Sequence, residues 1–282
     1  ERAAIGELLF YDTRLSNSNE IACASCHHLE LGGDDDKPLG LSNAAEKHIV
    51  NTPTVFNAIY NFRQQWDGAF KTMAEQIEHK LINQHEFNNT WGQVISALSK
   101  DNDIVRMFDE QYNDGITREN IIDALVEFEK TLVTPDSRFD RYLRSDGVTL
   151  SDDELEGYRL FKERGCVACH QGVNIGGNLF QKFGVFYNYI AERGDIRTAD
   201  FGRMNVTSRF IDEHVFKVPS LRNIAVTAPY LHDGSAETLE EVVRIMGVTQ
   251  LGSELTEEEI EQIKAFLLTL TGEYKGNPVG ED

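Results

Sequence analysis

Two five-residue stretches decide how this sequence is interpreted: Cys23-Ala24-Ser25-Cys26-His27 and Cys166-Val167-Ala168-Cys169-His170. They contain all four cysteines of the chain. One four-thiolate zinc site is an alternative, but zinc ribbons place their cysteine pairs closer together. A redox dithiol is another, but it needs a preceding strand in a βαβ unit, and the sequence shows neither. The pattern C-x-x-C-H is the attachment signature of c-type haem, in which the thiols form thioethers and the His ligates the iron. Its double occurrence predicts two covalently bound haems.

The same motifs predict where the protein works. Bacteria attach haem to C-x-x-C-H outside the cytoplasm, so we expect a periplasmic protein. The chain begins Glu1-Arg2-Ala3-Ala4, without an initiator Met or the apolar stretch of an export signal. We therefore expect that a signal peptide has been removed.

Composition excludes several classes of protein. Hydrophobic residues make up 40% of the 282 residues, enough for a sizeable core. No apolar run approaches the roughly 18 residues of a membrane-spanning helix. The net charge of −20 argues against a nucleic-acid or anionic lipid partner. Two interpretations of this charge remain open, namely attraction of a basic partner and solubility alone.

The two halves of the chain repeat each other at a spacing of 166 residues. Pro53-Thr54-Val55-Phe56-Asn57 matches Pro219-Ser220-Leu221-Arg222-Asn223, and an Asp-Gly pair follows fourteen residues after each Pro. Residues 117–132 and 256–270 both begin with Thr and carry apolar residues at helical spacing. Because strand-like alternation is rare, we predict a mainly α fold of two tandem cytochrome c-like domains, each with one haem and with little β structure.

Turn-forming residues mark the boundary between these domains. Residues 134–150 contain Thr-Pro-Asp-Ser and Arg-Ser-Asp-Gly, which favour turns and predict a linker. The first domain is then residues 1–133 and the second is residues 151–282.

The repeat also shows where the halves differ. Trp66 aligns with His232, and Lys80 aligns with Met246. Met is a usual sixth ligand of the iron in cytochromes c. We expect Met246 to ligate the second iron opposite His170. Because a protonated Lys is not a ligand, the first iron is expected to be five-coordinate or capped from elsewhere, and thus open to small ligands such as peroxide.

At these residues the chain resembles the bacterial di-haem cytochrome c peroxidases over nearly its whole length. The resemblance implies that the N-terminal domain is peroxidatic and that the C-terminal domain is an electron-entry domain with a His/Met haem. The segments that carry it are residues 8–16, 51–55, 66–68, 131–136, 172–177, 219–223 and 246–252.

The resemblance assigns roles to several further residues. Trp66 matches a family tryptophan that relays electrons between the haems, and Gln76 and Glu86 match the pair that lines the peroxide pocket. A carboxylate there can move a proton between the two peroxide oxygens. Asn51, Thr227 and Pro229 match a calcium site between the domains, built from oxygen ligands as calcium prefers.

One position departs from the family pattern. The family places an iron-capping His eight residues before the Asn of Asn-x-Pro, but this chain has Asn43 there. His48, three residues before Asn51, is a candidate distal ligand from a shifted register. The alternative is an iron that stays open even when oxidised. His79 and His85 lie close to the expected pocket in sequence without an assigned role.

The function that these residues and the resemblance imply is reduction of hydrogen peroxide to water. The electrons would come from a small donor, a cytochrome c or a cupredoxin, and dimerisation is common in the family. One alternative is a di-haem oxidase that modifies a tryptophan of a partner protein; that branch has Tyr in place of the axial Met, so Met246 argues against it. The other is a non-catalytic electron carrier or sensor, against which the pairing of Gln76 with Glu86 argues.

Overall fold

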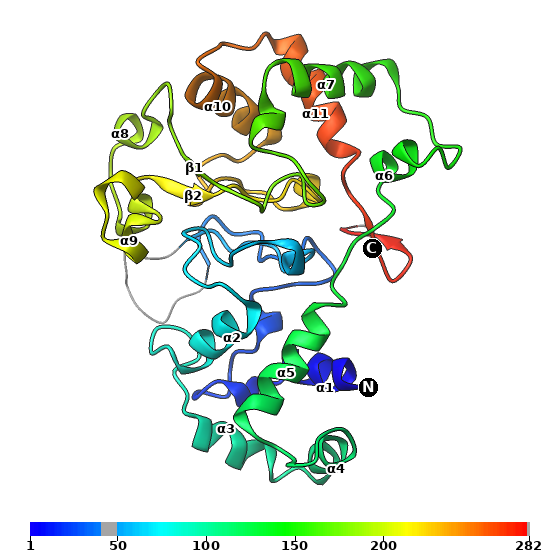
Figure 1. Cartoon of the computed structure of the whole chain (residues 1–282), viewed down its shortest axis with the longest axis vertical. Helices are drawn as coiled ribbons and strands as arrows, with labels where there is room; N and C mark the ends of the chain where they lie inside the picture. The colour runs from blue at the N-terminus through cyan, green and yellow to red at the C-terminus, as the bar shows by residue number, and fades with distance from the viewer. Residues whose placement is uncertain (41–49, 281–282) are drawn as a thin grey trace.

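The computed structural model describes residues 1–40 and 50–280 as two mostly helical lobes, one above the other (Figure 1). This confirms the predicted mainly α fold. No described helix has the length and apolar character needed to cross a membrane. The first lobe contains α1 (Arg2–Phe10), α2 (Met73–Ile82), α3 (Trp91–Leu98), α4 (Asn102–Gln111) and α5 (Arg118–Glu129). The second contains α6 (Arg138–Leu143), α7 (Asp152–Glu163), α8 (Tyr189–Arg193), α9 (Met204–Thr207), α10 (Leu239–Leu251) and α11 (Glu257–Leu268).

Regular β structure in the described residues is limited to two short antiparallel ribbons. In one, β1 (Phe180–Lys182) pairs with β2 (Val215–Lys217), and Phe180 lies opposite Lys217. In the other, β3 (Glu273–Tyr274) pairs with β4 (Asn277–Pro278). The first ribbon lies on the side of the second lobe that faces the first lobe (Figure 1).

In each lobe the first long helix crosses the last one at very close range. The backbone of α1 lies against α5 at Gly6, where a Cβ would come within 1.9 Å of the Ala124 carbonyl oxygen. The backbone of α7 lies against α11 at Gly157, where a Cβ would come within 1.8 Å of the Gln262 carbonyl oxygen. Only glycine allows helix backbones to approach this closely.

The segments between these helices also repeat in three dimensions. Asn57 and Asn223 both adopt left-handed backbone conformations, with φ of 61° and 60°, before a short 3₁₀ turn. Thr72 and Thr238 then cap α2 and α10 by accepting a hydrogen bond from the backbone N–H three residues on. The structure therefore supports the 166-residue repeat and makes α2 and α10 equivalent helices.

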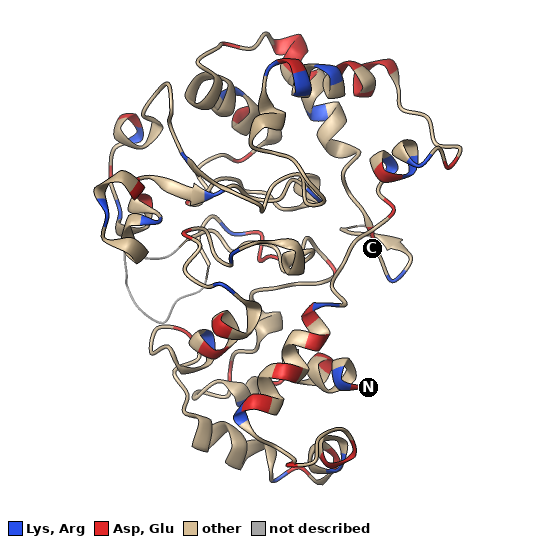
Figure 2. Cartoon of the chain, in the orientation of Figure 1, with Lys and Arg blue, Asp and Glu red and all other residues tan. Residues whose placement is uncertain are grey.

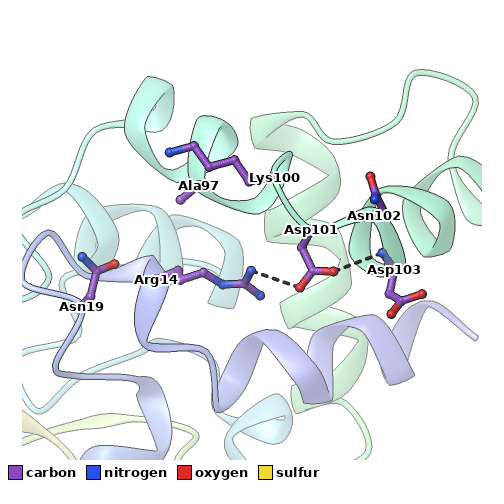
Figure 3. Close-up of a pocket in the computed structure, with 7 residues that line it drawn as sticks. All are labelled: Arg14, Asn19, Ala97, Lys100, Asp101, Asn102 and Asp103. Atoms are coloured by element: carbon purple, nitrogen blue, oxygen red, sulfur yellow. Dashed lines mark hydrogen bonds and ion pairs between the residues drawn. The ribbon is translucent and has the colours of Figure 1, made fainter.

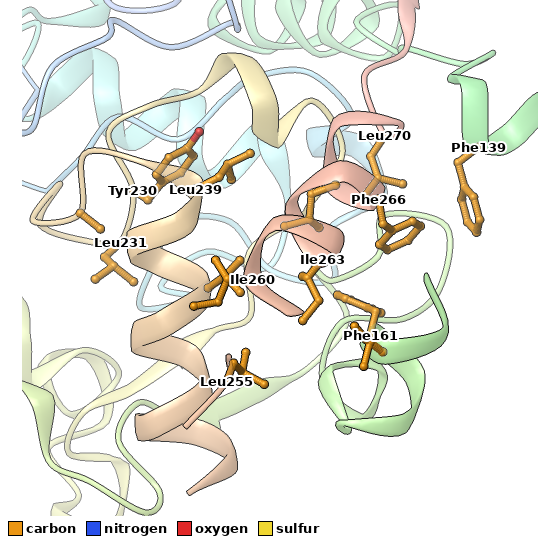
Figure 4. Close-up of a cluster of buried hydrophobic side chains, with 14 of the residues drawn as sticks. Phe139, Phe161, Tyr230, Leu231, Leu239, Leu255, Ile260, Ile263, Phe266 and Leu270 are labelled. Carbon is orange, nitrogen blue, oxygen red and sulfur yellow. The ribbon is translucent and has the colours of Figure 1, made fainter. Parts of the chain in front are cut away.

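Hydrophobic side chains form a separate core in each lobe. The core of the second lobe joins α7, α10 and α11 with side chains from the ribbon and from α6 (Figure 4). In the first lobe one core lies among α1–α5, and a further cluster surrounds the first attachment segment. Burial of this kind contributes about 25 cal/mol per Å² of apolar surface.

Two chain segments join the lobes in ways that the sequence did not predict. The predicted linker contains α6, whose Phe139 packs into the core of the second lobe. The C-terminal ribbon returns to the first lobe, where the rings of Tyr274 and Phe56 are 5.0 Å apart. Both the middle and the end of the chain therefore connect the two lobes.

Acidic residues lie at the beginning of several helices (Figure 2). Asp152, Asp153 and Glu154 open α7, and Glu257–Glu259 open α11. Anionic groups there interact favourably with the helix dipole. Part of the −20 net charge is therefore explained by helix stability.

Candidate functional site

The first attachment segment presents a histidine whose ring is already oriented. Cys23 begins a 3₁₀ turn, η2 (Cys23–Ser25), and His27 follows it directly. The His27 Nδ1–H donates a hydrogen bond to the Gly33 carbonyl oxygen at 3.0 Å. Burial lowers the pKa of His27 to about 4, so its imidazole is neutral at pH 7. A neutral imidazole with Nδ1 occupied offers Nε2 to a metal.

The second attachment segment has the same construction. Cys166 begins a 3₁₀ turn, η4 (Cys166–Ala168), and His170 donates from Nδ1 to the Ile175 carbonyl oxygen at 3.3 Å. Burial lowers the pKa of His170 to about 4 as well. Both histidines therefore have the geometry and charge state of proximal iron ligands.

The cysteines are free and do not form a metal centre of their own. Cys23, Cys26, Cys166 and Cys169 are unbridged and partly exposed. Among residues 1–40 and 50–280, no cysteine joins a cluster of three or more metal-ligating side chains. This removes the single zinc site as an interpretation and leaves two separate thiol pairs, each ready to form thioethers.

A buried cation between the lobes gives independent support for haem. Lys217 is 7% exposed. Burial lowers the pKa of Lys217 to about 8. A haem propionate is a carboxylate, and it could pair with this ammonium group. The residues present thus fit the group that the cysteines imply.

Trp66 lies at the junction between the lobes. Its indole Nε1–H donates to the Asn51 carbonyl oxygen at 2.9 Å, and its own carbonyl accepts from the Lys217 N–H at 2.8 Å. The ring packs against the core of the second lobe, with its centroid 6.4 Å from that of His232. The role of electron relay expected for Trp66 stays a prediction.

Lys80 and Glu86 pair at the end of α2. The Lys80 ammonium forms an ion pair with Glu86 Oε1, and Asn83 Nδ2 donates to Glu86 Oε2 at 3.0 Å. Gln76 lies one turn before Lys80 and therefore shares a face of α2 with it, while Met73, Ile77 and Leu81 pack into the core. From the sequence, Lys80 was expected only not to ligate the iron, and its pairing with Glu86 was not predicted.

The remaining predicted ligands and histidines are found as follows. Met246 lies on α10, partly buried against the core of the second lobe. His48 and Asn43 lie outside the described residues. His79 is exposed, with its ring centroid 4.9 Å from that of Phe70. The backbone N–H of His85 donates to Asn83 Oδ1 at 3.1 Å, which helps to shape the turn before Glu86.

Two of the three residues expected to bind calcium are in contact between the lobes. Asn51 Nδ2 donates to the Pro229 carbonyl oxygen at 3.2 Å, and Thr227 lies two residues before Pro229, which follows a cis peptide bond. A Cβ on Gly32 would lie 2.7 Å from Asp34 Oδ1 and 2.8 Å from Thr227 Cγ2. Asp34 Oδ1 is buried and has no hydrogen-bond partner among the described residues, and burial raises the pKa of Asp34 to about 7. An unsatisfied carboxylate beside backbone carbonyls suits a hard divalent cation.

A buried ionic cluster in the second lobe was missed by sequence reasoning. Asp200 Oδ1 accepts from His232 Nε2 and Asp200 Oδ2 accepts from Arg193, both at 2.6 Å. Arg193 also pairs with Asp233. Asp200, His232 and Asp233 could together hold a metal ion, but the Arg193 guanidinium already supplies their cation. In the sequence, the alignment of His232 with Trp66 was the signal that marked this cluster as different from the first lobe.

A polar hollow on the outer surface of the first lobe has a structural explanation. It is lined by Arg14 and by residues at the start of α4 (Figure 3). Asp101 there caps α4 and accepts a hydrogen bond from Arg14 Nη1 at 3.1 Å. The hollow takes no part in the site described above.

Two lobes of repeated helical structure, each with a C-x-x-C-H segment, define a tandem di-haem c-type cytochrome. Family models divide the chain in the same order: residues 1–147 match "Di-haem cytochrome c peroxidase" and residues 155–271 match "Cytochrome c". The chain belongs to the di-haem cytochrome c peroxidase family. The family prediction made from the sequence is therefore confirmed.

Curated relatives carry peroxidase names. Cytochrome c peroxidase Ccp of Escherichia coli is 42% identical over 275 residues, which are 97% of this chain and 59% of that protein. This chain therefore spans less than two thirds of the length of the Escherichia coli protein. Cytochrome c551 peroxidase of Nitrosomonas europaea is 42% identical over 274 residues, 97% of this chain and 80% of that protein.

A solved structure agrees with the fold. The crystal structure of a MauG-like protein associated with microbial copper homeostasis superposes with a TM-score of 0.86 at 27% identity. The match covers 96% of this chain and 89% of that one. The arrangement of the two lobes is thus shared with a solved member of this structural class.

Proposed function

We propose that this chain reduces hydrogen peroxide to two molecules of water at the first lobe, with two electrons that enter at the second. The observation that carries this proposal is the ion pair of Glu86 with Lys80 at the end of α2, with Gln76 one turn before Lys80 on the same helix. At the equivalent positions of the second lobe, Gln76 is replaced by Val242 and Glu86 by Gly252. The two residues that the resemblance assigns to the peroxide pocket are thus present in the first lobe and replaced in the second.

The residues of the first lobe divide the work at the peroxide. When bound, haem would supply the iron at which peroxide reacts. His27 would hold that iron. Glu86 would accept a proton from one peroxide oxygen and return it to the other, which leaves as water. Gln76 would orient the oxygens by hydrogen bonding. In the overall reaction, one peroxide takes up two electrons and two protons and gives two molecules of water.

The second lobe receives the electrons. His170 and Met246 would hold its iron, and a His/Met ligand pair raises the reduction potential and leaves no position for peroxide. Electrons then pass to the first lobe by way of Trp66, which contacts both lobes. This division assigns residues 1–133 to the peroxidatic domain and residues 151–282 to electron transfer.

The partner and the compartment follow from the same chemistry. Relatives named for cytochromes suggest a small cytochrome c or a cupredoxin as the donor, and the −20 charge favours a basic docking face. Covalent haem attachment supports a periplasmic location. Homodimer formation is part of the proposal on family grounds alone, as is iron capping by His48.

Calcium is proposed between the lobes, held by Asn51, Thr227 and Pro229. The Asn51 backbone also connects the first lobe to the second, since its N–H donates to the His232 carbonyl oxygen at 2.8 Å. A cation here would fix the distance between the lobes and neutralise the nearby Asp34 carboxylate.

Replacing Glu86 by Gln tests the function. We expect the rate of peroxide turnover by the di-haem protein to fall by about 10²–10⁴-fold, the usual contribution of general acid–base catalysis. The matched control is Glu78→Gln on the outer side of α2, where Glu78 pairs with Arg118 at the surface. Peroxide reduction at an unchanged rate in Glu86→Gln would show that Glu86 is not the acid–base group. A wild-type protein whose two haems stay six-coordinate and inert to peroxide in every redox state would be an electron carrier instead.

A further inference from the structure

Lys80 occupies the position of the first lobe that corresponds to the iron-ligand position of the second. Helices α2 and α10 begin at equivalent capping residues, Thr72 and Thr238, and Lys80 and Met246 are then eight residues further along each helix. The Lys80 side chain therefore leaves α2 where Met246 leaves α10. With haem in both lobes, Lys80 would face the first haem as Met246 would face the second.

The electrostatic surroundings agree with this placement. The Lys80 ammonium lowers the pKa of three groups around the attachment segment, namely His27, Cys23 and Asp67. Burial remains the larger influence on each of them. Because the Lys80 charge acts on Cys23 and His27, it lies on the side of the lobe where these two residues would hold the haem.

The acceptor of this charge is Glu86. The Lys80 and Glu86 side chains are 36% and 25% exposed, so the pair is more enclosed than the surface pairs of α7. Asn83 adds a hydrogen bond of 3.0 Å to the second oxygen of Glu86. A carboxylate held at both oxygens has a fixed orientation.

We propose that Lys80 is a positioning residue of the peroxide site, which holds the Glu86 carboxylate in place beside the first haem. This inference rests on the proposed function and adds the residue that orients its base. Glu86 would take the proton from one peroxide oxygen and return it to the other. The Lys80 ammonium would stabilise the negative charge that develops on the peroxide between these two transfers.

The test compares Lys80→Leu, Lys80→Arg, Glu86→Gln and the double variant Lys80→Leu/Glu86→Gln as di-haem proteins. Leu is used because Met at this position could itself ligate the iron. The first readout is the rate of peroxide turnover. The second is the association rate of hydrogen cyanide with the first haem, because cyanide also binds as an anion after giving its proton to a base. Lys71→Leu is the matched control, since it removes an exposed lysine two residues before α2.

We expect Lys80→Leu to slow both reactions by about ten- to a hundredfold, the range for loss of a hydrogen bond to a charged group. Lys80→Arg should recover most of the rate, because a guanidinium also pairs with a carboxylate. The double variant should be little slower than Glu86→Gln alone, since Lys80 acts through Glu86. Lys71→Leu should match the wild type.

Three results would overturn the inference. Wild-type cyanide and peroxide rates in Lys80→Leu, with slow rates in Glu86→Gln, would leave the proposed function intact and remove Lys80 from it. Additive losses in the double variant would show that Lys80 acts independently of Glu86. A first haem that is low-spin in the wild type and high-spin in Lys80→Leu would show that Lys80 ligates the iron. If Glu86→Gln itself reacts normally, the proposed acid–base function fails first.

Discussion

Asp200→Asn is the perturbation for which the structure gives the clearest magnitude. The Asp200 carboxylate is fully buried and accepts three hydrogen bonds of 2.6 Å, from His232, from Arg193 and from the Arg197 N–H. Breaking a buried ion pair by removing one partner costs about 3–5 kcal/mol. Because Arg193 keeps Asp233 and Asn keeps one acceptor oxygen, we expect about 3 kcal/mol at pH 7.

The pH dependence of this loss follows from the charge of Asp200. Burial raises its pKa, but hydrogen bonds from His232 and Arg193 more than offset this, so its pKa lies below the ordinary value. The carboxylate therefore contributes its stability above the unfolded pKa of about 3.9 and loses it as the pH falls toward the lower folded value. The variant has no such contribution to lose, so the two stabilities should converge in acid.

Urea unfolding at pH 7 and at pH 3, followed by far-UV circular dichroism, measures both quantities. Asp195→Asn is the control, because Asp195 is exposed and its pairing with Arg197 at 3.4 Å should contribute no more than about 1 kcal/mol. A deficit below about 1 kcal/mol for Asp200→Asn at pH 7 would refute the reasoning. So would a deficit of the same size at both pH values.

Two further predictions concern packing and calcium. Gly6→Ala should destabilise the protein by about 1–3 kcal/mol or more in urea unfolding because its Cβ would overlap the Ala124 carbonyl oxygen, whereas Gly92→Ala, in open space on α3, should be neutral or stabilising. Asn51→Ala should abolish the rise in melting temperature that added calcium gives the wild type over a chelator-treated sample, and an equal rise in both proteins would place the calcium elsewhere.

The helices and the repeat could be predicted from local patterns. Residues 117–132 and 256–270 place apolar side chains at helical spacing, and α5 and α11 form inside those ranges. The haem-attachment segments could be predicted because the two thiols and the histidine of C-x-x-C-H lie within five consecutive residues. Information of this kind is local, so it survives without knowledge of the tertiary fold.

Contacts between distant segments could not be predicted in the same way. Arg193, Asp200 and Asp233 are dispersed over forty residues, and each alone reads as a surface charge. The return of Tyr274 to Phe56 crosses almost the whole chain. The burial of Lys217 is equally invisible, because a lysine at the end of a three-residue strand normally faces solvent. These features depend on which surfaces the folded lobes bring together.

The two lobes show how one fold can provide two different haem environments by changing a few side chains at fixed positions. Both lobes share the same backbone features, namely a helix crossing at a glycine and a threonine cap at the start of α2 or α10. On the proposal made here, a neutral thioether at Met246 closes the second iron, because sulfur is a ligand. A charged amine at Lys80 cannot ligate while it is paired with Glu86, so it leaves the iron accessible and at the same time prepares the base. Lys80 would then both leave the first iron accessible and orient the base that reacts with peroxide. The difference between Met246 and Lys80 at equivalent helix positions would account for much of the functional difference between the two haems.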